Sequence, residues 1–153
     1  MAIPLVGLTL PNAQWRTLTG REEAAILDLR PQALLVLGYP DSPVLGEKVA
    51  QEASLWEALG RPPVLLRPYA PDIAGWPPEE WATVCVGLWR WYHAHGMEPE
   101  LVLANELNLE GMGEDWPRMA DWLAAAAWAT SQRLPTVRLP LPALAPPGSY
   151  RDG

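Results

Sequence analysis

Five short runs of almost purely apolar residues recur along the chain, each bounded by Gly, Pro or Asn. An apolar run without alternating polar positions is typical of a parallel strand that is buried on both faces. The runs predict strands at Ile3–Leu10, Ala33–Gly38, Val64–Arg67, Leu101–Ala104 and Thr136–Leu141. Because proline has no backbone N–H to donate, Pro140 and Pro142 limit the fifth strand, and only Thr136–Leu139 is expected in the sheet.

Helical signals occupy the stretches between these runs. Thr19 and Glu22 have the spacing of a capping box, and Ser42-Pro43 resembles an N-cap followed by proline in the first turn. Four helices are predicted, from Thr19 to about Arg30, from Ser42 to Gly60, from Pro77 to Gly96 and from about Asp115 onward. Stripes at helical spacing predict the buried sides of the last two, which carry Trp81, Val84, Cys85, Leu88 and Tyr92, and Met119, Ala120, Leu123 and Ala127, respectively.

Strands and helices therefore alternate, which predicts an α/β fold with a parallel sheet and right-handed connections. The strand starts recur every 30 to 37 residues, as in repeated βα units. A complete (β/α)8 barrel needs about 250 residues. The 153 residues instead suit one domain, 1–153, of four βα units plus a fifth strand, with a loop-like tail at 145–153. This is either a half or partial TIM barrel or an open sheet, and a flavodoxin-like sheet ranks last because no phosphate loop is present.

Composition narrows the class of protein. Nearly half of the residues are apolar and 19% are charged, which argues against disorder, and the net charge of −7 argues against a nucleic-acid partner. No apolar run approaches the ~20 residues that span a bilayer, so no membrane partner is expected. The N-terminus lacks the features of a signal peptide, which favours a cytoplasmic location. The single cysteine, Cys85, excludes an internal disulfide and a cysteine-based zinc cluster.

Polar side chains gather where the predicted strands end, at the edge where parallel α/β proteins build their sites. The candidates for binding a polar ligand are Trp15 after the first strand, Tyr39 after the second, Arg67 and Tyr69 at the third, and Asn105, Glu106 and Asn108 after the fourth. Ordinary loop composition is an alternative explanation, because loops are generally polar. No Gly-rich phosphate loop or nucleophilic-serine elbow occurs, so no cofactor is expected. His93 and His95 have no third ligand nearby, so no metal is expected either.

Glu106 is the sharpest of these candidates. It directly follows the apolar run Leu101–Ala104, and the low dielectric at the end of a buried strand favours a raised pKa, as a general acid needs. The preceding Asn105 lies on the other side of an extended strand unless the backbone bends there. Alternatively, Glu106 caps a loop or pairs with Arg67. Glu110 is a possible second carboxylate, or else a solvated acid ahead of the fourth helix.

Asn105-Glu106 at the end of a fourth strand resembles the acid/base motif of clan A glycoside hydrolases, which are (β/α)8 barrels. The stretch LVLANELNLE is similar to the Gly-Asn-Glu-Pro-Asn-Leu form of that motif, with Ala104 and Leu107 in place of its Gly and Pro. The resemblance implies a carbohydrate substrate, Glu106 as general acid/base, Asn105 at the sugar 2-hydroxyl and Arg67 beside the nucleophile. In that family the nucleophile follows the seventh strand. The resemblance therefore also implies that the nucleophile is absent from this chain, and the chain alone is not expected to be catalytically competent.

Two functions are therefore expected. The first is a glycoside hydrolase-like barrel portion that acts on a carbohydrate. The alternative is a non-catalytic half-barrel that binds a sugar or a protein partner, or self-associates, because exposed sheet edges need cover. Association with the missing barrel half or a homo-oligomer would supply that cover. The loop residues Trp15, Trp76 and Trp116 suit either a sugar cleft or a hydrophobic interface.

Overall fold

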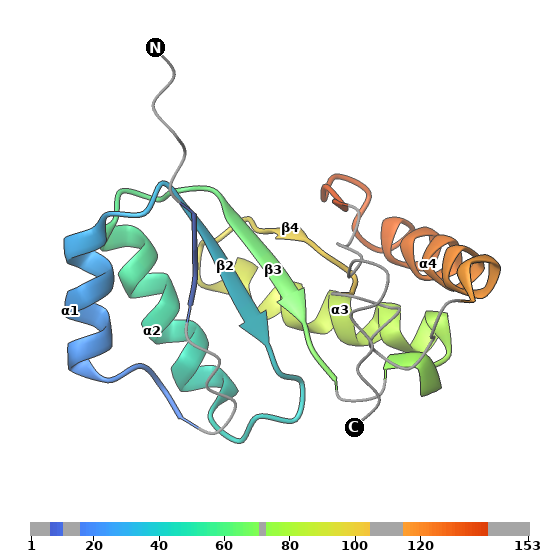
Figure 1. The fold of residues 1–153 in the computed structure, drawn as a ribbon, viewed down its shortest axis with the longest axis horizontal. Helices are drawn as coiled ribbons and strands as arrows, with labels where there is room; N and C mark the ends of the chain where they lie inside the picture. The colour runs from blue at the N-terminus through green and yellow to red at the C-terminus, as the bar shows by residue number, and fades with distance from the viewer. Residues whose placement is uncertain (1–6, 11–15, 71–72, 105–114, 141–153) are drawn as a thin grey trace, which may run out of the picture.

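The computed structural model describes residues 7–10, 16–70, 73–104 and 115–140 (Figure 1). The strands are β1 (Gly7–Thr9), β2 (Ala33–Gly38), β3 (Val64–Pro68) and β4 (Glu100–Leu101). The helices are α1 (Gly20–Leu29), α2 (Leu45–Ala58), α3 (Pro78–Ala94) and α4 (Trp116–Ser131), and the short 3-10 helix η1 (Ile73–Gly75) precedes α3. The predicted α/β class and the alternation of strands and helices are confirmed.

The four strands form one parallel sheet in the order β1-β2-β3-β4. Pairing is most extensive in the centre, where five residue pairs join β2 to β3, against three between β1 and β2 and two between β3 and β4. Right-handed connections between consecutive neighbours place the connecting helices on one face of a sheet. Figure 1 shows α2 and α3 behind the strands, on that face. We term the opposite side, which the described helices leave uncovered, the helix-free face.

Alternation along the strands separates the core from the helix-free face. Leu34, Val36 and Leu66 point toward the helices and are at most 1% exposed. Their neighbours Leu35 and Leu65 lie on the helix-free face and are half-buried. The main core therefore lies between the sheet and its helices. The apolar runs predict strands buried on both faces, but among the described residues the helix-free face is buried only in part.

Of the two N-caps predicted from the sequence, the structure has the one at Thr19 and lacks the one at Ser42. The Thr19 hydroxyl accepts a hydrogen bond from the Glu22 backbone N–H, and the Glu22 carboxylate accepts one from the Thr19 backbone N–H, which confirms the capping box. The predicted start at Ser42 is wrong, because α2 begins at Leu45. Ser42 instead forms a turn, in which its carbonyl accepts from the Leu45 N–H and its hydroxyl from the Val44 N–H.

The predicted strands also need correction at the sheet's edges. Residues 1–6 of the first lie outside the described residues, and the fourth spans Glu100–Leu101 instead of Leu101–Ala104. The predicted fifth strand is not formed over 136–140. Only one backbone hydrogen bond links this segment to β4, from the Leu101 N–H to the Arg138 carbonyl. Pro135 and Pro140, on either side of the segment, cannot donate to a ladder, which explains why no strand forms.

A buried polar triad joins α2 to α3. Lys48 forms an ion pair with Glu52 one helical turn away, and the Tyr92 hydroxyl donates a 2.7 Å hydrogen bond to the same carboxylate. All three residues are at most 3% exposed. Burial raises the pKa of the Glu52 carboxyl, an effect that Lys48 and Tyr92 oppose, and burial together with the Glu52 charge raises that of the Tyr92 phenol. The triad satisfies its own charges and hydrogen bonds within the core.

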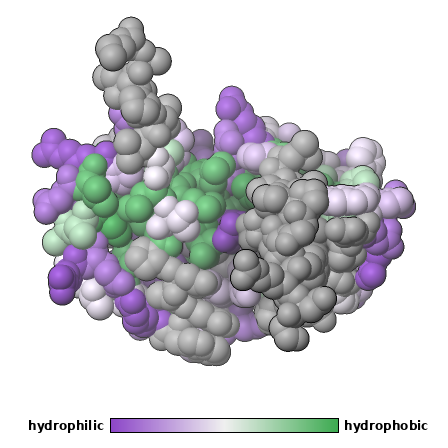
Figure 2. All heavy atoms as spheres, in the orientation of Figure 1, coloured by the Kyte–Doolittle hydropathy of each residue, from purple (hydrophilic) through white to green (hydrophobic). Residues whose placement is uncertain are grey.

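The helix-free face keeps apolar surface at its β1 side, as Figure 2 shows over the strands. A hollow of about 190 Å³ lies there, lined by residues of β1, β2 and β3, namely Gly7, Leu8, Thr9, Ala33, Leu34, Leu35 and Leu65. None of the helices in the described part of the chain is long and apolar enough to cross a membrane.

Candidate functional site

Three of the predicted site residues converge at the carboxyl ends of β2 and β3. Leu37 pairs with Arg67 and Gly38 with Pro68, and the Tyr69 N–H donates a 2.8 Å hydrogen bond to the Gly38 carbonyl. This register brings Tyr39 next to Tyr69. Alternation then puts both tyrosines on the same side of the sheet as Arg67, the helix-free face. We refer to Tyr39, Arg67 and Tyr69 as the edge cluster.

Tyr39 is the buried member of the edge cluster. It is 2% exposed, and its ring meets the ring of Tyr69 edge-on, with 5.4 Å between centroids. Burial raises the pKa of the Tyr39 phenol, Tyr69 raises it further, and the positive charge of Arg67 opposes both. Both neighbours therefore act on the Tyr39 hydroxyl at short range.

The Tyr39 hydroxyl has no hydrogen-bond partner within the part of the chain that the structure describes. Leaving a buried hydroxyl unsatisfied costs about 1–3 kcal/mol, so such groups are rare and call for an explanation. A bound ligand that accepts a hydrogen bond would remove this cost. The Tyr39 hydroxyl is therefore a buried polar group that the described residues leave unsatisfied.

Arg67 is exceptional in its position. It is the one basic residue among the described strands, and the register sets it between Leu37 and Val102, both buried. An arginine within an apolar row requires partners for its guanidinium, since an unpaired buried charge is very unfavourable. Its side chain is half-buried at the end of β3.

A tryptophan of α3 fixes the backbone beyond β4. From the sequence, this residue, Trp81, is predicted only as part of an apolar stripe. Trp81 of α3 is fully buried, and its indole N–H donates a 2.6 Å hydrogen bond to the Leu103 carbonyl. Ala104, next along the chain, is also fully buried. Trp81 thus positions the chain just before Asn105-Glu106. The indole N–H of a buried tryptophan always needs an acceptor, which is the only sequence signal for this role.

The remaining predicted site residues, Trp15, Asn105, Glu106 and Asn108, lie outside the described residues. Their contribution to a site therefore stays a prediction.

The loop tryptophans differ from one another. Trp76 packs edge-on against Trp81, at 5.7 Å between ring centroids, and its carbonyl accepts a hydrogen bond from the Trp122 indole. This links the loop to both α3 and α4. Trp116, in the first turn of α4, is 45% exposed. Trp116 is thus the more available of the two for stacking against a ligand.

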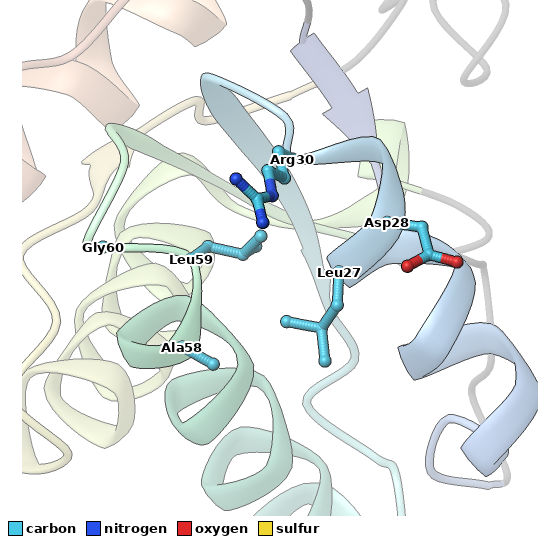
Figure 3. Close-up of a pocket in the computed structure, with 6 residues that line it drawn as sticks. All are labelled: Leu27, Asp28, Arg30, Ala58, Leu59 and Gly60. Carbon is cyan, nitrogen blue, oxygen red and sulfur yellow. The ribbon is translucent and has the colours of Figure 1, made fainter.

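A separate hollow of about 660 Å³ opens at the other end of the sheet, between the last turns of α1 and α2 (Figure 3). Arg30 and Leu59 point toward one another across it, while the Asp28 carboxylate points away. This is the amino end of the strands, where α/β proteins seldom place their chemistry. No group of three or more His, Cys, Asp or Glu side chains among the described residues could hold a metal ion.

Comparison with protein-family models, with curated proteins and with solved structures found no match for this chain.

Proposed function

We propose that this chain forms part of a (β/α)8-type barrel whose carboxyl edge binds carbohydrate, and that Glu106 acts there as general acid/base. The strand order supports the barrel. Strands that follow one another around the sheet, with helices on one face, are the arrangement of a barrel wall, whereas a doubly wound sheet reverses its order and carries helices on both faces.

The edge cluster is the observation that carries the proposal. Tyr39, Arg67 and Tyr69 come from two neighbouring strands and meet at the edge where barrel enzymes bind their substrates. Leu103 and Ala104 lead from β4 directly into Asn105-Glu106 in sequence. Hydroxyl-rich ligands such as sugars suit a cluster of this kind, because they accept and donate hydrogen bonds.

The proposed chemistry is cleavage of a glycosidic bond. The Glu106 carboxyl donates its proton to the glycosidic oxygen as the bond from that oxygen to the sugar breaks. Asn105 holds the 2-hydroxyl, the edge cluster and Asn108 hold other hydroxyls, and Trp15 stacks on the sugar ring. A second carboxylate completes such a reaction, either as nucleophile or as the base that activates water.

The test uses a protein in which the missing barrel half supplies the second carboxylate, and it compares leaving groups between this protein and its Glu106→Gln variant. Aryl glycosides with a poor leaving group need protonation, so their hydrolysis should fall by about a hundredfold or more in the variant. Dinitrophenolate departs without protonation, so for dinitrophenyl glycosides the rate of the first step, cleavage of the glycosidic bond, should fall much less.

Glu98→Gln is the matched control, since Glu98 is an exposed carboxylate that precedes β4, at the end of the strand opposite the proposed site. Equal rates for the wild-type and Glu106→Gln proteins on both substrates would remove Glu106 from the mechanism.

A second candidate function is self-association through the β1 side of the helix-free face. The half-buried Leu35 and Leu65 border a hollow there, and apolar surface of this kind is typical of a surface covered in an assembly. A second copy of the chain can offer the same apolar surface in a symmetric dimer. Light scattering at micromolar concentration should then give a dimer for the wild type and a monomer for Leu35→Arg. A wild-type monomer would contradict this function.

A further inference from the structure

A hollow of about 350 Å³ opens at the loop between β3 and α3, on the carboxyl side of the sheet. Its lining residues are Gly75, Trp76, Pro77 and Glu80. The volume falls within the range of small-molecule sites, about 300–1,000 Å³. Three of these residues are exposed and Trp76 is half-buried, so the hollow is open to solvent. An open hollow suits one unit of a longer molecule better than a ligand that must be fully enclosed.

The aromatic wall of the hollow is held in place by three contacts. The Trp76 N–H donates a 3.1 Å hydrogen bond to the Ile73 carbonyl, and the Trp76 carbonyl accepts a 2.9 Å hydrogen bond from the Trp122 indole. The ring meets that of Trp81 edge-on, with 5.7 Å between centroids. A ring that is fixed before a ligand arrives loses little conformational freedom on binding. Trp76 is therefore a preformed surface for stacking.

Glu80, in the first turn of α3, supplies the polar side of the hollow. Its carboxylate has no ion pair or hydrogen bond within the part of the chain that the structure describes. A carboxylate accepts hydrogen bonds through two oxygens, so it can receive two neighbouring hydroxyl groups. A sugar ring has an apolar C–H face and a rim of hydroxyls, which match Trp76 and Glu80, respectively. The negative charge of Glu80 favours a neutral sugar over an acidic one.

Trp81 connects the hollow to the proposed carbohydrate site. Its ring contacts that of Trp76, and its indole N–H donates to the Leu103 carbonyl just beyond β4. Leu103 precedes Glu106 by three residues in the sequence. The hollow and the chain that leaves β4 are thus joined through a single tryptophan. A saccharide chain with one unit at the end of β4 has a second surface available to it at the hollow.

We infer that the hollow is a subsite for a neutral sugar unit, with the sugar ring stacked on Trp76 and its hydroxyls donating to Glu80. The chain then binds an oligosaccharide more tightly than a single sugar. This rests on the proposed carbohydrate site and adds the length and the charge class of its ligand.

The experiment is calorimetric titration of the full chain with three series, glucose against cellotriose, glucose against maltotriose, and xylose against xylotriose. In at least one series the trisaccharide should bind about tenfold more tightly than the single sugar, because a further stacked ring buries more apolar surface.

Trp76→Ala assigns this gain to the hollow. It should weaken binding of the trisaccharide by about tenfold or more and should change binding of the single sugar much less. Trp128→Ala is the matched control, because Trp128 is an exposed tryptophan on α4 that does not line the hollow. It should leave both affinities unchanged.

Glu80→Ala tests the polar side, and it should weaken trisaccharide binding by about tenfold, since hydrogen bonds to a charged group are lost. Glu79→Ala is its control, because Glu79 is an exposed carboxylate in the same helical turn that does not line the hollow. The side chain of Glu80 is exposed, so its removal keeps the inference testable even where Trp76→Ala fails to fold.

The outcomes distinguish the inference from the function on which it rests. Trisaccharides that bind no more tightly than single sugars overturn the subsite and leave the carbohydrate site standing. Equal losses for single sugars and trisaccharides in Trp76→Ala and Glu80→Ala also overturn the subsite, since a purely structural role predicts them. Absence of binding by every sugar overturns both the subsite and the carbohydrate site.

Discussion

Lys48 and Glu52 carry opposite charges inside the core, with Tyr92 as the third member of their triad. Removing one charge of a buried pair leaves the other uncompensated, which costs about 3–5 kcal/mol. Glu52→Gln should therefore lower the free energy of unfolding by roughly that amount, as measured by urea denaturation followed by circular dichroism. The result would show that the triad matters through its charge balance.

The triple variant Lys48→Met, Glu52→Met, Tyr92→Phe is the control for this prediction. Replacing every polar member with an apolar residue of similar size leaves no uncompensated charge in the core. The triple variant should therefore recover most of the stability that Glu52→Gln loses. A triple variant as unstable as Glu52→Gln alone would mean that packing, and not charge, limits the site.

At the scale of elements, the contact between β2 and α3 leaves almost no spare room at Gly38. A Cβ at this position would lie 3.1 Å from Leu88 and 3.2 Å from Leu66. Gly38→Ala should therefore destabilise the protein by about 1–3 kcal/mol, the usual cost of overpacking. Thermal unfolding would measure this loss.

Gly87→Ala provides the matched comparison, since a Cβ there meets nothing within 4 Å and the residue is exposed on α3. Alanine is favoured over glycine inside a helix by about 1 kcal/mol, so this change should stabilise the protein slightly. Equal effects at the two positions would show that the Gly38 contact is not limiting.

The start of α1 should respond to acid. Arg16 donates hydrogen bonds of 2.7 and 2.8 Å to the Glu22 carboxylate, and these, with the bonds from Thr19, lower the pKa of Glu22 to about 2 from 4.5. The folded protein then releases this proton at a lower pH than the unfolded chain does. Glu22 therefore stabilises the fold fully above about pH 4.5, and that contribution is lost as the pH falls toward 2.

Glu22→Gln tests this, because the amide oxygen can still accept from Thr19 but does not titrate. The difference in stability between wild type and variant should be greatest above pH 4.5, small because the pair is exposed, and should shrink toward pH 2. In an Arg16→Gln background the same substitution should show a weaker pH dependence. A difference that grows as the pH falls would contradict the linkage.

Local signals predicted most elements, because apolar stripes lie within single helices and side chains at Thr19 and Asp115 cap the starts of α1 and α4. The capping box at Thr19 is self-contained. On α3 the predicted stripe of Trp81, Cys85, Leu88 and Tyr92 is buried, and its fifth member, Val84, is half-buried. Ser42 does not cap α2, because it forms a turn before the helix begins at Leu45. In this turn the Ser42 hydroxyl and carbonyl accept from the N–H groups of Val44 and Leu45.

The buried side of α4 was predicted only in part. Of the predicted residues, Met119 is buried, Leu123 and Ala127 are half-buried, and Ala120 is exposed. Trp122 and Ala126 complete the buried side. Apolar residues occur all around this helix, and Trp128 is 69% exposed, so periodicity alone does not identify the side that packs.

Across the whole molecule, part of the candidate site could be predicted from the sequence. Parallel strands end at one edge, and alternation puts Tyr39, Arg67 and Tyr69 on one face of it. What the sequence could not supply was the interior chemistry between distant segments, such as the contact of Tyr92 with Glu52 and of Trp81 with Leu103. Both depend on how helices pack on the sheet, and neither has a short-range pattern.

The strand order has a consequence for how the molecule opens. Because each strand pairs only with its neighbours in sequence, β1 and β4 can detach one at a time while β2 and β3 keep their five paired residues. Amide hydrogen exchange should accordingly be slowest at Leu34 and Tyr69, whose N–H groups donate across the central pair of strands, and faster by about tenfold or more at Leu10, whose N–H donates from the β1 side to Leu35. Uniform protection across all four strands would instead mean that the sheet opens as one cooperative unit.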